Sequence, residues 1–212
     1  MTTLRQYRLA LQIFQANRLR RDYSDLAAIP QYELVGEFFF NEMYGPRDYS
    51  ARDAGARRLQ NVLHMLPGVH LHDVEQVLAL LDLTNRLDNH LAQVMLRDRV
   101  GLDFDEATYE AAYRQADNYD ERLRQLNLIS SSTYTVFRLS RSQLLGVGLH
   151  RSRLLARLAG IEAAHSFLVK GYDALRDVSD ITLFAETVHA RELERLNRIY
   201  GRPIAPETPV ST

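Results

Sequence analysis

Apolar residues recur along the chain at the three- and four-residue spacing of amphipathic helices, and no stretch alternates as a strand does. In the first segment, Leu4, Tyr7, Leu11 and Phe14 follow this spacing and predict a helix over residues 3–21. The same pattern, interrupted by glycine and proline, continues almost to the end of the chain. Further helices are predicted over residues 30–44, 50–66, 71–99, 103–140 with a break, 150–159, 161–176 and 179–200.

Glycine, proline and serine set the predicted boundaries between these helices. Pro30 suits a first helical turn, and the serines of residues 130–132 indicate a break or bend. Asp103 or Asp105 is the predicted N-cap of the helix over residues 103–140. Gly146 and Gly148 mark a loop after that helix.

The pattern as a whole predicts an all-α fold. We expect a single irregular or orthogonal bundle of about seven to eight helices. It should form one domain over residues 1–200, followed by a disordered C-terminal tail over residues 201–212.

Composition narrows the class of protein. The chain has 212 residues, which suits one domain, and it contains no cysteine, which excludes disulfides and thiolate sites. It has no signal-like leader and no apolar run approaching the ~20 residues of a membrane span. We therefore expect a cytoplasmic protein. The broad apolar arcs of the helices over residues 30–44 and 71–99 favour a homodimer.

Three adjacent phenylalanines precede a Tyr-Gly-Pro turn and two Arg-Asp pairs, in the stretch FFFNEMYGPRDYSARD at residues 38–53. On a helix, the phenylalanines would belong to a broad apolar arc that also contains Glu42. A buried carboxylate needs a partner, and the arginines of the turn could supply it. The predicted ion-pair network, in which one arginine could alternatively hold an anionic ligand, comprises Glu42, Arg47, Asp48, Arg52 and Asp53.

This stretch resembles the N-terminal motif of a family of uncharacterised, all-helical bacterial proteins, FF…YGPRD.S.RD. The resemblance continues through LALLDLTNRLD at residues 78–88 and FLVKGYDALRDVSDITLFAETVHARE at residues 167–192. It implies a single helical domain and a shared Arg-Asp turn. It implies no activity, because the family has none assigned.

Two Glu-x-x-His pairs lie on neighbouring predicted helices, as Glu162 with His165 and Glu186 with His189. Such pairs supply ligands in carboxylate-bridged di-metal bundles, and imidazole with carboxylate suits iron, manganese or zinc. A complete site of that kind also needs a glutamate from each of two other helices, and none is evident. The favoured interpretation is two core histidines with no metal; a metal-dependent enzyme is the alternative.

Seven arginines and no acidic residue lie between Glu121 and Glu162. Phosphate, nucleic acid, an anionic membrane surface or an acidic protein could pair with them. Pairing with acids elsewhere in the fold is the favoured interpretation, because 26 basic residues are balanced by 27 acidic ones. A near-neutral protein is also a poor non-specific binder of nucleic acid. The candidate basic surface comprises Arg138, Arg141, His150, Arg151, Arg153 and Arg157.

The sequence therefore predicts no catalytic residues and no cofactor. The leading hypothesis is a non-catalytic helical protein that assembles with itself or an unknown protein, or that binds a small ligand. The alternatives are the metal-dependent enzyme and binding of phosphate or nucleic acid through the arginine-rich stretch.

Overall fold

The computed structural model describes residues 3–43, 54–55, 58 and 71–203, and every regular element in these ranges is helical. The all-α class expected from the sequence is confirmed. The elements are α1 (Leu4–Asp22), α2 (Ser24–Ala27), a 3-10 turn (Pro30–Tyr32), α3 (Glu33–Phe38), a π-helix (Phe39–Met43), α5 (Leu71–Arg97), α6 (Glu106–Gln115), α7 (Tyr119–Ser140), α8 (Gln143–Arg151), α9 (Arg153–Leu158), α10 (Glu162–Leu175) and α11 (Thr182–Tyr200).

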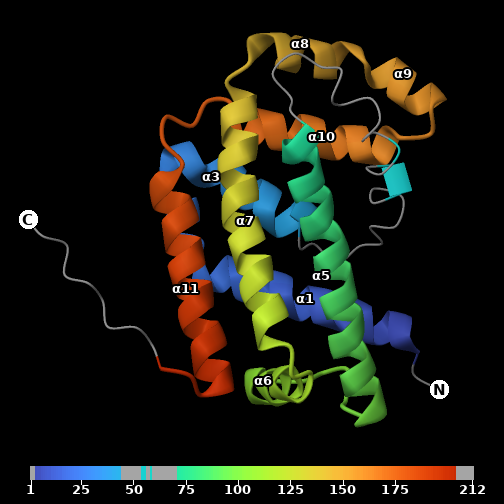
Figure 1. The fold of residues 1–212 in the computed structure, drawn as a ribbon, viewed down its shortest axis with the longest axis vertical. Helices are drawn as coiled ribbons and strands as arrows, with labels where there is room; N and C mark the ends of the chain where they lie inside the picture. The colour runs from blue at the N-terminus through green and yellow to red at the C-terminus, as the bar shows by residue number, and fades with distance from the viewer. Residues whose placement is uncertain (1–2, 44–53, 56–57, 59–70, 204–212) are drawn as a thin grey trace, which may run out of the picture.

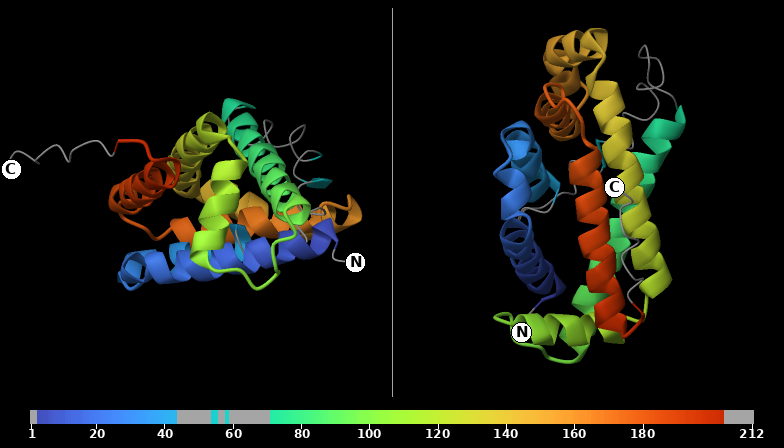
Figure 2. Two further views of the ribbon diagram at one scale, coloured as in Figure 1. Left: turned by 90° about the horizontal axis from the view of Figure 1, so that it is seen from below. Right: turned by 90° about the vertical axis from the view of Figure 1, so that its left-hand side faces the viewer.

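The helices form two crossed layers (Figure 1). In one layer α5, α7 and α11 run alongside one another, with α7 in the middle in contact with both neighbours. In the other layer α1, α3 and α10 cross behind them (Figure 2). The short helix α6 closes one end of the molecule, and α8 and α9 cover the other. None of the described helices is long and apolar enough to cross a membrane.

Several helix ends form where the sequence predicts them. Thr3 and Gln6 make a capping box at the start of α1. The side chain of Asp105 accepts a hydrogen bond from the backbone of Thr108 at 2.9 Å, which identifies Asp105 rather than Asp103 as the cap of α6. Pro30 occupies the first turn of its helix, as expected.

The predicted helix over residues 30–44 is not regular. It is a 3-10 turn, a short α-helix and a π-helix in succession. A π-helix has one extra residue per turn and therefore rotates the side chains that follow it. Leu34 lies in α3, before the π-helix, and is 55% exposed, although helical spacing places it among the apolar residues of the predicted helix.

Two other predicted interruptions are wrong. Gly146 and Gly148 do not mark a loop: both lie inside α8, which Ser142 caps. The helix α7 continues through the serines of residues 130–132. Within that helix, Ser131 and Thr133 donate their hydroxyls to backbone carbonyls of the preceding turn, so these side chains are satisfied without a break. The real break falls at residues 116–118, where Asp117 has a positive φ.

The predicted helix over residues 50–66 lies mostly outside the described residues. The predicted tail over residues 201–212 lies outside them from residue 204 onward.

Candidate functional site

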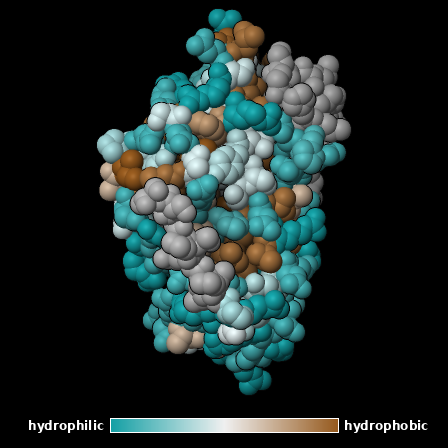
Figure 3. Space-filling view, turned by 60° about the vertical axis from the view of Figure 1, so that its left-hand side comes forward, coloured by the Kyte–Doolittle hydropathy of each residue, from teal (hydrophilic) through white to brown (hydrophobic). Residues whose placement is uncertain are grey.

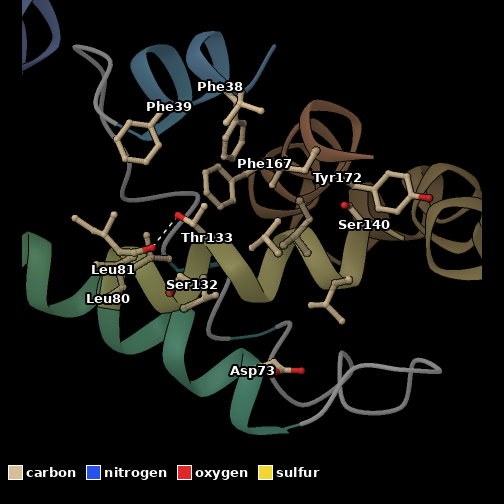
Figure 4. Close-up of a pocket in the computed structure, with 18 of the residues that line it drawn as sticks. Phe38, Phe39, Asp73, Leu80, Leu81, Ser132, Thr133, Ser140, Phe167 and Tyr172 are labelled. Carbon is tan, nitrogen blue, oxygen red and sulfur yellow. Dashed lines mark hydrogen bonds between the residues drawn. The ribbon is translucent and has the colours of Figure 1, made fainter. Parts of the chain in front are cut away.

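An apolar cavity lies where the N-terminal half of α5 and the C-terminal half of α7 meet the crossing helices (Figure 4). Its volume is about 170 Å³, close to the ~150 Å³ of an apolar protein cavity that holds benzene. Side chains from α3, the π-helix, α5, α7, α8, α10 and α11 contribute to its wall. Representative wall residues are Phe38, Leu81, Ile129, Leu149, Phe167 and Leu175.

The adjacent phenylalanines form one corner of this cavity (Figure 4). Phe38 packs on Phe167 of α10, with ring centroids 5.2 Å apart. Phe39, the first residue of the π-helix, packs edge-on against Phe184 of α11 at 6.1 Å. The two neighbouring side chains therefore join α3 to two different helices, which confirms that these residues are core.

Few polar side chains reach the cavity, and most of them already have a partner. Thr133 donates to the carbonyl of Ile129 at 2.8 Å, and Ser140 donates to that of Phe137 at 2.7 Å. The hydroxyl of Ser132 is buried and has no hydrogen-bond partner among the described residues. A buried, unpaired hydroxyl costs free energy, so Ser132 is the polar group that a ligand could satisfy.

Tyr172 closes the cavity under α8. Its hydroxyl donates to the carbonyl of Ser142 at 3.1 Å, and its ring lies directly against Gly146. A side chain at position 146 would overlap that ring, so the glycine permits the close approach of α10 to α8.

Only part of the predicted Arg-Asp network can be located. Glu42 accepts a hydrogen bond at 2.8 Å from Lys170, the single lysine of the chain. The side chain of Glu42 is 17% exposed, and Lys170 of α10 is one partner of its carboxylate. The remaining members, Arg47, Asp48, Arg52 and Asp53, lie outside the described residues.

The histidines of the two Glu-x-x-His pairs have separate partners. The Nε2 atom of His165 lies 2.8 Å from the carbonyl of Leu149, and that of His189 lies 3.0 Å from the side-chain oxygen of Asn127. Glu162 and Glu186 are exposed. No group of three or more potential ligands is arranged for a metal within the described ranges. The alternative of an iron, manganese or zinc site therefore gains no support beyond the sequence pattern.

The arginine-rich stretch divides into paired and exposed parts. Arg138 pairs with Asp73 at 2.7 Å, Arg141 donates to the carbonyl of Ser179, and His150 lies 3.3 Å from Asp173. Arg151, Arg153 and Arg157 are exposed on α8 and α9. Apolar side chains reach the surface at this end of the molecule (Figure 3). On α8 and α9 the exposed ones are Leu144, Val147, Leu154, Leu155 and Leu158.

A buried ion pair that no sequence motif indicates joins the two layers. The Nη1 and Nη2 atoms of Arg18 donate to the two carboxylate oxygens of Glu192 at 2.6 and 3.0 Å, and Tyr23 donates to the same carboxylate at 2.7 Å. Burial favours the neutral acid, but Arg18 and Tyr23 together lower the pKa of Glu192 below its ordinary value. The sequence indicates a buried position for Arg18, because Arg18 continues the seven-residue spacing of Leu4 and Leu11 on an apolar stripe.

Comparison with known proteins yields one match. The family model described as "Domain of unknown function (DUF8198)" matches residues 1–206. No curated protein and no solved structure matches the chain.

Proposed function

The chain belongs to the DUF8198 family of unknown function, and we propose that it is a non-catalytic protein that binds a small apolar molecule. The cavity under α8 and α10 supports this proposal. A concave, mostly apolar cavity with a few polar groups is the usual form of a small-molecule site.

The free energy of the cavity favours a bound apolar ligand. Apolar side chains line most of the cavity, and covering apolar surface with a ligand gains about 25 cal/mol per Å² of area removed from water. The unpaired hydroxyl of Ser132 favours a ligand that carries one hydrogen-bonding group on an apolar body.

Thermal unfolding in the presence of benzene, phenol and cyclohexanol tests this proposal. At about a hundred times its dissociation constant, a bound ligand raises Tm by about 5–10 °C. We expect phenol or cyclohexanol to bind more tightly than benzene, and Ser132→Ala to remove that difference. Val136 of α7 lines the cavity, so the larger side chain of Val136→Phe should occupy the cavity and abolish binding.

Val147→Phe is the matched control, because Val147 is 50% exposed on the opposite side of α8. It should bind the same ligands as the original chain. Equal responses of the Val136 and Val147 variants, or no saturable response of the original chain, would contradict the proposal.

A second candidate function is docking of α8 and α9 on an anionic lipid surface. Leu144, Leu154 and Leu158 are 75%, 67% and 77% exposed, and they alternate with exposed arginines. Leucine beside arginine on an outer helix face is typical of segments that lie in a membrane interface. Pairing with anionic headgroups supplies the charge that this acid-free stretch lacks.

Sedimentation with vesicles tests the docking. We expect binding to vesicles that contain phosphatidylserine and little binding to pure phosphatidylcholine. Each of Arg153→Gln and Arg157→Gln should weaken binding about fivefold, from ~1 kcal/mol per arginine. Arg5→Gln, on the exposed side of α1, should have no such effect. Equal binding to both kinds of vesicle, or equal loss in all three variants, would exclude the docking.

A further inference from the structure

A second, smaller cavity lies where α1, α5, α6, α7 and α11 meet, and both charged and apolar side chains line it. Its volume is about 60 Å³, several times the ~10–15 Å³ that one water molecule needs. Three arginines line it, Arg18, Arg122 and Arg195, together with the acids Asp88 and Glu192. Arg18 and Arg195 are ion-paired through their terminal nitrogens, Arg18 with Glu192 and Arg195 with Asp22 and Glu106.

The arginines leave hydrogen-bond donors unused at this cavity. The Nε atoms of Arg18, Arg122 and Arg195 are buried and have no partner among the described residues, and neither has Nη2 of Arg122. Buried polar groups are almost always paired. Several unpaired donors around one cavity therefore indicate that an acceptor belongs inside it.

Arg122 presents the most specific geometry. Its side chain is 4% exposed, and its Nη1 atom is held by Asp88 at 3.3 Å and Gln125 at 3.0 Å. The ring of Tyr113 lies against the guanidinium, with its centroid 4.6 Å from Cζ. Nε and Nη2, the two unpaired atoms, form one edge of the guanidinium. Such an edge can donate two parallel hydrogen bonds to an oxyanion.

We propose that this cavity binds a small oxyanion, a carboxylate or a phosphate, through the free edge of Arg122. The Nε atoms of Arg18 and Arg195 supply further unpaired donors in the same wall. The proposal is independent of the apolar ligand, because it depends on different side chains; the two cavities share only Phe39 and Ile129 among their wall residues.

Titration of the chain with sodium acetate and with sodium phosphate, against sodium chloride at equal ionic strength, tests this site. We expect acetate or phosphate to raise Tm saturably, by about 5–10 °C at a hundred times the dissociation constant. Which of the two does so identifies the class of anion. Arg122→Gln should lose the response, whereas Arg124→Gln should keep it, because Arg124 is exposed on the same helix.

Gln125→Glu covers the case in which Arg122→Gln fails to fold. This change keeps the shape of the side chain and places a carboxylate beside Arg122, where Gln125 already accepts a hydrogen bond. We expect a folded protein that no longer responds to either anion. The proposal would be overturned if both anions act like chloride on the original chain, or if the Gln125→Glu variant responds as the original does.

Discussion

Replacing Glu192 with alanine is expected to lower the free energy of unfolding by about 3–5 kcal/mol, because it removes the carboxylate that binds both terminal nitrogens of the buried Arg18 and leaves Arg18 with the more distant Asp22, at 3.5 Å. Arg18 is 9% exposed in its side chain, and Glu192 binds both of its terminal nitrogens. The pair joins α1 to α11, two helices of different layers. Denaturation in urea, monitored by circular dichroism, measures the change.

Glu194→Ala is the matched control, because Glu194 is exposed on the same helix. Its effect should stay within about 0.5 kcal/mol, as for most surface substitutions. Similar losses in the two variants would show that the Arg18 pair contributes nothing specific to stability.

The same carboxylate predicts a dependence on pH. The pKa of Glu192 is lower in the folded chain than in the unfolded one. Its contribution is therefore fully present above the unfolded pKa of about 4.3, and it is lost as the pH falls through the folded pKa. Tm measured from pH 6 down to pH 3 should fall less steeply in a Glu192→Gln variant than in the original chain.

Replacing Gly146 with alanine is expected to destabilise the protein by about 1–3 kcal/mol, whereas the same change at Gly148 should stabilise it. A methyl group at position 146 would overlap the hydroxyl and ring of Tyr172, while at position 148 it meets nothing within 4 Å. Both residues lie in α8, where alanine is favoured over glycine by about 0.5–1 kcal/mol. Thermal unfolding of the two variants measures the contrast.

A third variant tests whether the ring of Tyr172 causes the cost of Gly146→Ala. In a chain that already carries Tyr172→Leu, Gly146→Ala should lose its extra cost, because the overlapping ring is gone. If the cost of Gly146→Ala is the same with and without the tyrosine, the contact between α8 and α10 does not explain the glycine.

The sequence predicts much of the helical pattern because that pattern is local. The start of α5, the end of α11, the cap at Asp105 and the first turn at Pro30 follow from residues near one another in the chain. Gly146 was misassigned to a loop because its role is to admit Tyr172, a residue of another helix. Propensity alone does not contain that information.

The candidate sites are harder to predict for the same reason. The partners Arg18 and Glu192 are 174 residues apart in the sequence, and the apolar cavity has walls from seven elements. Neither leaves a short motif. The sequence offers only a charge at an apolar position, which indicates a buried partner without naming it.

Phe39 and Ile129 line both the apolar cavity and the smaller cavity, and so form a partition that is common to the two. A molecule that displaces either side chain from one cavity changes the shape of the other. Thermodynamic linkage then requires reciprocity: an oxyanion that strengthens or weakens binding of an apolar ligand by some factor has its own affinity changed by the same factor. These two side chains are thus where cooperativity between the ligands would originate.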